Sequence, residues 1–267
     1  MKTIKELMNL RGRVALVSGG AGNIGRAASE ALAELGASIV LADRDGDAAE
    51  AFSDDLEKRY EVEVLPLSID LRSEDEIQSV PILTVERFGR LDILINSAAL
   101  VGTTKRNGWT VPFAQQRLGP WNEALETNLT GVFLLIQACA DSLSVSGRGS
   151  VVNLGSIYGS VGPDMRLYEG TNMGNPAAYA ASKGGLLQLT RWLSTVLAPT
   201  IRVNSISPGG IWRNQAEIFR KRYEEKTPMK RMATEEDIKG AIIYLASDMS
   251  AYVTGHDLVV DGGWTTW

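Results

Sequence analysis

A tyrosine and a lysine stand four residues apart in the segment PAAYAASKGG, residues 176–185. If this segment is helical, Tyr179 and Lys183 lie on one face of the helix, one turn apart. A free tyrosine has a pKa of about 10 and is a poor acid–base catalyst at neutral pH. A nearby ammonium group favours the phenolate and so lowers that pKa. The pair therefore indicates a phenol that can transfer a proton, although the same spacing also occurs by chance on helix surfaces.

A glycine-rich turn, SGGAGNIG at residues 18–25, stands between an apolar run and a helix-like segment. Gly20, Gly22 and Gly25 satisfy the pattern G-x-G-x-x-G. Glycines let the backbone approach a pyrophosphate closely, and free N–H groups at the start of the helix can bind it. A plain tight turn is the alternative. The predicted phosphate-binding residues are Gly19, Gly22, Asn23, Ile24 and Gly25.

Asp43 ends the second apolar run, 18 residues after Gly25 (43 − 25 = 18). A carboxylate there can accept hydrogen bonds from both hydroxyls of an adenosine ribose, and it repels the 2′-phosphate of NADP. Arg44 weakens that exclusion, because a guanidinium group attracts phosphate. The sequence therefore predicts a dinucleotide cofactor, NAD in preference to NADP, with Asp43 and Arg44 at its adenosine end.

The elements that would position these residues are seven apolar, β-branched runs, which alternate with segments of helical period. The runs span residues 13–18, 37–42, 62–69, 91–96, 150–156, 201–207 and 256–262. Uninterrupted apolarity is typical of parallel strands covered on both faces. The alternation predicts an α/β fold, a doubly wound parallel seven-stranded sheet (Rossmann fold), in a single domain spanning residues 1–267. Pro81 lies in the helical segment 74–89 and is expected to kink or interrupt it.

Composition disfavours several classes of protein. The net charge is −5 with no block of like charges, which argues against nucleic-acid binding. Cys139 is the only cysteine and lies in an apolar segment, so we expect a buried thiol in a reducing compartment. His256 is the only histidine, so we expect neither a histidine-rich metal site nor a Ser-His-Asp triad.

No continuous apolar run approaches the ~20 residues that a membrane span requires. The N-terminus is too charged for a signal peptide. We therefore expect a cytoplasmic protein that acts on a small molecule, with no metal and no membrane partner.

Six further motifs follow in order along the chain: NSAAL, ETNLTGVF, VVNLGSIYG, YAASK, SPGG and VTGHDLVVDGG. With the glycine turn and the Tyr-Lys pair, they make the chain resemble the short-chain dehydrogenase/reductase family, in its shorter single-domain branch, over nearly its whole length. The resemblance implies a catalytic tetrad of Asn128, Ser156, Tyr179 and Lys183. The other cofactor contacts that it implies are Asp70, Leu71, Asn96, Pro208, Gly209 and Ile211.

Each of these residues has an implied role. Tyr179 would be the general acid/base, and Lys183 would lower its pKa and bind the nicotinamide ribose. Ser156 would hold the substrate oxygen, and Asn128 would anchor a water that links the lysine to solvent. Among the cofactor contacts, Asp70 would place the adenine, Asn96 would brace the cofactor-side loop, and Pro208-Gly-Gly210 would border the nicotinamide.

The chain departs from the family pattern in two places. Asn23 stands where that branch usually has glycine, but asparagine tolerates a left-handed backbone better than most residues. The resulting spacing of Gly19, Gly22 and Gly25 imitates the longer branch of the family, which contains nucleotide-sugar epimerases and dehydratases. The interval from Ser156 to Tyr179, 179 − 156 = 23 residues, is longer than usual and should bulge out at the mouth of the active site.

The expected function is an NAD(H)-dependent oxidoreductase that interconverts a secondary alcohol and a ketone. The alternatives are a nucleotide-sugar epimerase or dehydratase with tightly bound NAD, and a non-catalytic protein that senses the dinucleotide. We expect substrate loops at 101–120, 159–176 and 211–231, the last a mobile lid on which Trp212 and Arg213 could touch ligand. Polar groups of the first two loops are Lys105, Arg106, Asn107, Arg117, Arg166, Glu169, Thr171 and Asn172.

These polar loops favour a sugar-like or hydroxy-acid substrate over a steroid or long chain, which would need an apolar lining. Surface decoration or subunit contact is the alternative role for the same loops. The predicted helices 121–143 and 177–198 carry more apolar residues, such as Leu129 and Trp192, than a helix with one wet face should. The family resemblance implies that they form a four-helix interface, so we expect a homotetramer.

Overall fold

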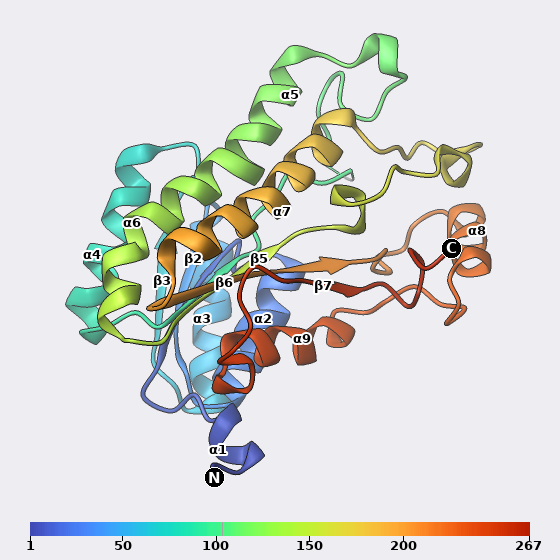
Figure 1. Cartoon of the computed structure of the whole chain (residues 1–267). Coiled ribbons are helices and arrows are strands. Elements are labelled where there is room, and N and C mark those ends of the chain that lie inside the picture. Colours follow the sequence, from blue (N-terminus) through green and yellow to red (C-terminus); the bar gives the residue numbers. More distant parts are fainter. Residues whose placement is uncertain (103) are drawn as a thin grey trace.

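Seven parallel strands form the central sheet of the computed structural model, which describes residues 1–102 and 104–267. In space the strands follow the order β3-β2-β1-β4-β5-β6-β7 (Figure 1). Their bounds are Val14–Ser18 (β1), Ser38–Asp43 (β2), Val64–Ser68 (β3), Ile93–Asn96 (β4), Gly149–Leu154 (β5), Ile201–Pro208 (β6) and Asp257–Val260 (β7). Each strand overlaps a predicted run, so the predicted sheet is confirmed. Residue 103, in the predicted loop 101–120, lies outside the described residues.

Helices cover both faces of this sheet. One face packs against α2 (Asn23–Glu34), α3 (Gly46–Tyr60) and α9 (Glu236–Ala246), and the other against α4 (Glu74–Phe88), α6 (Gly131–Val145) and α7 (Ala177–Leu197). Side chains alternate along a strand, so Leu16 of β1 joins one core and Val17 joins the other. Both side chains are fully buried, which explains why a doubly covered strand has no polar alternation.

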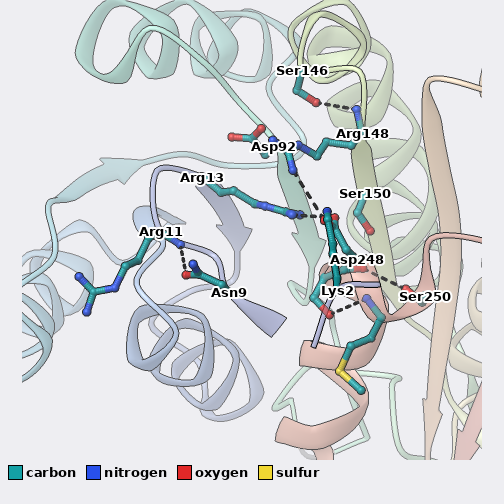
Figure 2. A network of polar contacts seen from close by, with 12 residues as sticks. Lys2, Asn9, Arg11, Arg13, Asp92, Ser146, Arg148, Ser150, Asp248 and Ser250 are labelled. Atoms are coloured by element: carbon teal, nitrogen blue, oxygen red, sulfur yellow. Dashed lines mark hydrogen bonds and ion pairs between the residues drawn. The ribbon is translucent and has the colours of Figure 1, made fainter. Parts of the chain in front are cut away.

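The amino ends of the strands carry a polar network that holds the N-terminal segment, which includes α1 (Ile4–Met8). Asp248, just after α9, accepts from Arg13 at 2.6 Å and Lys2 at 3.3 Å, and Arg148 lies 3.7 Å away (Figure 2). These ion pairs tie the start of the chain to the turn after α9, at the end of the sheet opposite to its carboxyl edge.

Helix α4 continues through Pro81 without a break. The prediction that proline would interrupt it is wrong. Ile77, Val80 and Thr84 are fully buried around this point, and the Thr84 hydroxyl donates to the Val80 carbonyl oxygen at 2.7 Å. The packing of these side chains outweighs the one backbone hydrogen bond that proline removes.

A long helix lies beside α4 and α7 on the second face of the sheet. It begins as α5 (Leu118–Leu125), passes through a π-helical turn at Glu126–Thr130, and continues as α6. Within the described residues it is one helix that is long and apolar enough to cross a membrane, by length and composition only. The prediction that no continuous apolar run reaches that length is not contradicted, because polar residues interrupt the apolar stretch of this helix. In the structure α6 packs against α4 and β5, as a core helix does.

The three predicted substrate loops gather at the carboxyl edge of the sheet. In Figure 1 the segment before α5, the segment between β5 and α7, and α8 (Glu217–Lys226) lie at the same end of the molecule. Open α/β sheets bind their ligands at this edge. The fold thus brings the loops to the strand ends that carry the predicted site residues.

Candidate active site

Helix α7 carries the Tyr-Lys pair along one face. It begins after Pro176, whose ring fixes a φ close to that of a helix. The Ala177 N–H, which has no partner inside the helix, donates to the Gln116 side chain at 3.1 Å. The Lys183 ammonium lies 5.9 Å from the ring centroid of Tyr179. The first turns of α7 therefore set the predicted spacing.

The Lys183 side chain is buried at the end of β5. Only 4% of the residue is exposed, and its ammonium donates to the Leu154 carbonyl oxygen. Burial lowers the pKa of Lys183 to about 8, because the charged form loses its hydration. The lysine is therefore still mainly charged at neutral pH, and the carbonyl oxygen at the end of β5 holds its ammonium in place.

The Tyr179 phenol lies in the wall of a cavity of about 830 Å³ at this edge. Burial raises the pKa of Tyr179, while the nearby Ser156 hydroxyl and the charge of Arg213 act in the opposite direction. Burial of the phenol is the largest of these effects, and the predicted lowering of this pKa by Lys183 stays a prediction. The phenol is thus protonated at neutral pH.

Ser156 follows β5 and is 6% exposed. Its hydroxyl accepts a hydrogen bond from the Tyr158 N–H at 3.2 Å, which starts a short 3-10 turn at Ile157–Gly159. This bond holds the serine oxygen in the wall that it shares with Tyr179 and Lys183. The geometry brings together three members of the predicted tetrad around one cavity.

Asn128, the fourth member, lies on the π-helical turn and is fully buried. Its amide donates to the Leu100 carbonyl oxygen and to the Ser182 hydroxyl, both at 3.0 Å, and accepts from the Leu100 N–H at 2.7 Å. Both amide donors are in use, and the side chain holds the segment after β4 against α7. The predicted role of Asn128 as the anchor of a water stays a prediction.

Asn96 ends β4 and belongs to a buried polar chain. Its amide donates to the Asn153 side chain at 2.9 Å, and Asn153 donates to the Thr190 hydroxyl at 2.9 Å. This chain links β4, β5 and α7 beneath the loop that follows β4. The bracing role implied by the resemblance fits this placement, and Asn96 is not among the described residues that line either cavity.

A second cavity of about 280 Å³ lies along the glycine turn. Its lining includes the predicted cofactor residues Gly19, Gly22, Asn23, Ile24, Gly25, Asp43, Arg44, Asp70 and Leu71. Gly22 caps α2 without a side-chain hydrogen bond, so N–H groups of the first turn remain available for an anion.

Two glycines make the close turn possible. Gly19 has φ +66°, and a Cβ there would lie 2.6 Å from the Ala98 backbone, while a Cβ on Gly25 would overlap the Gly19 carbonyl oxygen. Asn23 begins α2 and is not among the described residues with positive φ. The left-handed backbone invoked for Asn23 is therefore not needed. The turn fits a dinucleotide pyrophosphate.

The end of this cavity that is predicted to hold the adenosine carries charged groups. The Asp43 carboxylate accepts from the Ala21 N–H at 3.0 Å and from the Asp45 N–H at 3.1 Å. These two bonds hold the acid beside the glycine turn and leave further lone pairs for ribose hydroxyls. Arg44 lines the same cavity.

Asp70 does not close the third strand, because β3 ends at Ser68. Its carboxylate accepts from the Arg72 guanidinium at 2.6 and 3.1 Å, and this pairing lowers the pKa of Asp70. Leu71 is 6% exposed and lines the cavity next to it. The loop after the strand, not the strand itself, presents both residues.

The larger cavity, of about 830 Å³, is lined by three of the predicted catalytic residues, Ser156, Tyr179 and Lys183, and by the predicted nicotinamide border. Pro208, Gly209 and Ile211 all line it. Four of the eight polar loop residues line it as well: Lys105, Arg106, Asn107 and Asn172. The other four, Arg117, Arg166, Glu169 and Thr171, are absent from the described lining. Arg166, for example, turns outward to Asp164 at 2.8 Å.

One wall of this cavity is aromatic, which the loop sequences do not predict. Tyr158, Tyr168, Phe219 and Tyr223 line it. The rings of Tyr168 and Phe219 lie 5.2 Å apart, and those of Phe219 and Tyr223 lie 5.9 Å apart. The expectation that the loops offer no apolar lining is therefore wrong for this wall. The sequence signal that could have predicted this wall is the spacing of Phe219 and Tyr223, which lie one helical turn apart.

The segment 211–231 contains α8 and is anchored to the insertion before α7. Arg222 donates to the carbonyl oxygen of Arg166 at 3.1 Å, and Lys226 pairs with Asp164 at 3.0 Å. Of the two residues expected at the ligand, Arg213 lines both cavities. Trp212 is not in the described lining and lies 5.3 Å from the Arg220 guanidinium.

Cys139 and His256, the only cysteine and the only histidine of the sequence, have contacts typical of structural residues. Cys139 is fully buried, and burial raises the pKa of its thiol to about 12. The His256 backbone N–H donates to the Asn204 side chain at 3.0 Å. Across residues 1–102 and 104–267, no three His, Cys, Asp or Glu side chains are grouped to hold a metal ion.

Comparisons with known proteins agree with this geometry. A family model described as enoyl-(acyl carrier protein) reductase matches residues 19–265. The post-translational flagellin modification protein A of Campylobacter coli is 31% identical over 256 residues, which cover 96% of this chain and 99% of the relative. A 3-oxoacyl-[acyl-carrier-protein] reductase of Thermotoga maritima is 32% identical over 266 residues, with coverage of 96% and 99%. The sorbose reductase of Schizosaccharomyces pombe is 29% identical over 267 residues, with coverage of 97% and 98%.

Solved structures are similar along the whole chain. A short-chain type dehydrogenase/reductase from Mycobacterium marinum has a TM-score of 0.87 at 30% identity, covering 99% of both chains. An NADPH-dependent 3-quinuclidinone reductase from Rhodotorula rubra has a TM-score of 0.85 at 27% identity, covering 100% of this chain and 96% of that one.

Proposed function

Because the chain belongs to the short-chain dehydrogenase/reductase family of oxidoreductases, we propose that it interconverts a secondary alcohol and a ketone with NAD(H). The observation that carries the proposal is the convergence of Ser156, Tyr179 and Lys183 on one cavity, next to a second cavity along the glycine turn. A protein that only senses the dinucleotide would not need this proton-transfer group.

Tyr179 moves the proton in the proposed reaction. During reduction its hydroxyl donates to the substrate oxygen, which suits a phenol whose pKa is raised by burial. During oxidation the phenol must first lose its proton, and the positive charge of Arg213 favours that loss. The Ser156 hydroxyl donates to the same substrate oxygen and orients it.

Lys183 completes the machinery at the end of β5. Its ammonium has three N–H donors, of which one meets the Leu154 carbonyl oxygen. The others are available for the nicotinamide ribose. When bound, the dinucleotide supplies the hydride acceptor or donor. Asn128 holds the segment after β4 against α7 and so fixes the cavity floor.

The proposed cofactor is NAD rather than NADP, because Asp43 lines the smaller cavity, where the proposed site for the adenosine lies. A fixed carboxylate favours two free ribose hydroxyls and repels a 2′-phosphate. Arg44, next to it, is the residue that would support NADP instead. The quinuclidinone reductase with a similar fold is NADPH-dependent, so the preference needs a direct test.

A polar, sugar-like or hydroxy-acid substrate suits the larger cavity. Lys105, Asn107 and Asn172 offer hydrogen bonds on one side of it. The sorbose reductase among the relatives acts on a sugar, as its name says. The aromatic wall adds that part of the substrate is apolar or presents a flat ring face.

We also propose a cytoplasmic homotetramer. Trp192 and Val196 on the outer side of α7 are 55% and 52% exposed, and Leu118 at the start of α5 is 71% exposed. Large apolar side chains in such number are typical of a surface that another subunit covers. The single domain spanning residues 1–267 would then pair through these helices.

A substrate panel tests the proposal. Secondary alcohols are incubated with NAD or NADP, and the matching ketones with NADH or NADPH, while the nicotinamide absorbance is followed. Turnover of polar alcohols with NAD supports the proposal. Tight cofactor that stays bound through purification, with no net change in absorbance, would favour an epimerase or dehydratase instead.

A further inference from the structure

The larger cavity has charged walls of one sign. Its lining contains Lys105, Arg106, Lys183 and Arg213, and no described lining residue is an aspartate or a glutamate. The chain as a whole has a net charge of −5, so this local excess runs against its composition. A concave site with one sign of charge attracts ligands of the other sign.

Three of these four cations already have a partner, and Arg213 uses only part of its guanidinium. Arg106 pairs with Glu123 at 2.9 Å, and the Lys183 ammonium meets the Leu154 carbonyl oxygen. Lys105 takes part in no ion pair within the described chain. Arg213 uses its Nε to reach Glu235 at 3.0 Å. Its two terminal nitrogens have no carboxylate partner among the described residues, and they form the planar fork that suits an oxyanion.

The backbone around Arg213 is held in place. Ile211 forms a β-bridge with Ala233, and the Trp212 N–H donates to the Ala233 carbonyl oxygen at 2.8 Å. The Arg213 N–H donates to the Gln215 side chain at 2.7 Å, and Gln215 donates back to the Ile211 carbonyl oxygen at 2.7 Å. Glu235 then orients the guanidinium, so its position is preorganised for a ligand.

Arg213 is also within electrostatic reach of the reacting phenol, since its charge acts on Tyr179. The aromatic wall formed by Tyr158, Tyr168, Phe219 and Tyr223 lines the same cavity. A molecule held by its oxygen at Tyr179 could therefore place an anionic group at Arg213 and its carbon skeleton on the rings.

We propose that the substrate carries an oxyanion, a carboxylate or a phosphate, which Arg213 binds with Lys105 as a second cation. This inference rests on the proposed function and narrows its substrate class to anionic hydroxy or oxo compounds. A neutral polyol would leave both cations without a partner inside the cavity.

Matched pairs of compounds test the inference and separate the two oxyanions. For the carboxylate, 4-hydroxycyclohexanecarboxylate is compared with its neutral amide in the oxidative direction. For the phosphate, dihydroxyacetone phosphate is compared with dihydroxyacetone in the reductive direction. The expected result is a higher kcat/KM for the anion in at least one pair.

The variants Arg213→Met and Arg213→Lys show whether the guanidinium is responsible. A hydrogen-bonded charge pair corresponds to about tenfold to a hundredfold in affinity, so Arg213→Met should cost the anion that much in kcat/KM. It should cost the neutral partner less, because that compound loses only the effect of the Arg213 charge on Tyr179, which both members of a pair share. The ratio of the two kcat/KM values should therefore fall, and Lys105→Met should show a smaller fall of the same kind. Arg213→Lys should fall between, because lysine keeps the charge but not the fork. Arg166→Met, an exposed arginine outside the cavity lining, is the matched control.

Binding measurements keep the inference independent of turnover. Titration calorimetry on wild type and Arg213→Met gives the dissociation constants of each anion, its neutral partner, and NADH. If no alcohol or ketone reacts, the proposed function fails, and weaker binding of the anion by Arg213→Met would still support the oxyanion site. Equal losses for anionic and neutral compounds, or a loss confined to NADH, would overturn it.

Discussion

Replacing Lys183 with methionine should stabilise the cofactor-free protein at neutral pH while abolishing its activity. Lys183 is 4% exposed, and its pKa of about 8 compares with an ordinary 10.5. Charging it therefore costs about 3 kcal/mol more in the folded protein than in the unfolded chain. Methionine fills similar space without that cost but loses the bond to the Leu154 carbonyl oxygen, which is worth about 1 kcal/mol. The expected net gain at pH 7 is about 2 kcal/mol.

The stability advantage of Lys183→Met should depend on pH. Between pH 8 and 10.5 the unfolded chain keeps the proton on Lys183 while the folded protein releases it, so wild-type stability rises with pH through that window. The advantage of Lys183→Met should therefore shrink above pH 8 and nearly vanish by about pH 10.

Urea unfolding at fixed protein concentration, at pH 7 and pH 10, measures both effects. Lys221→Met, at a side chain that is 67% exposed, is the control and should shift stability by less than about 0.5 kcal/mol. The reasoning is refuted if Lys183→Met is less stable than wild type at pH 7, or if its difference from wild type does not change with pH.

Three further predictions concern the cofactor, the proton and the assembly. Asp43→Ser should reduce the preference for NADH over NADPH in kcat/KM, and a wild type that already prefers NADPH would point to Arg44 as the determinant. Because burial raises the pKa of Tyr179, the initial rate of alcohol oxidation should rise with pH, whereas the rate of ketone reduction should fall at alkaline pH. The same pH dependence in both directions would contradict this. Trp192→Glu places a charge on the exposed side of α7 and should shift the proposed tetramer to smaller species in light scattering. A wild type that is already monomeric at micromolar concentration would contradict the proposed interface.

The strands could be predicted from the sequence because their signal is local. Leu16 and Val17 are both fully buried, each in a different core, so the strand has no polar side and reads as one apolar run. Pro81 shows the limit of such reasoning. Its effect depends on what α4 packs against, and that is set by residues distant in the sequence.

The convergence of Ser156, Tyr179 and Lys183 on one cavity could be predicted, but the surroundings of these residues could not. The spacing of Tyr179 and Lys183 follows from one helix, whereas the bond from Lys183 to Leu154 joins residues 29 positions apart. Burial of the phenol, which raises the pKa of Tyr179, also depends on residues distant in the sequence. Asn128 is similar, since its partners Leu100 and Ser182 lie on separate segments.

The character of the substrate cavity was the least accessible to prediction. Its aromatic wall combines Tyr158 and Tyr168, which precede β6 in the chain, with Phe219 and Tyr223, which follow it. Polar composition of the loop 159–176 suggested a polar lining, but Arg166 turns outward to Asp164. Composition gives the content of a loop and not the direction of each side chain.

The most direct test of the central claim is the variant Tyr179→Phe. Its turnover is assayed with a substrate that wild type converts, and its affinity for NADH is compared with that of wild type. Only the ionisable oxygen is removed, so the account predicts loss of turnover by about a hundredfold or more with a dissociation constant for NADH close to that of wild type. Retention of most of the activity by Tyr179→Phe would contradict the assignment of this phenol as the proton-transfer group.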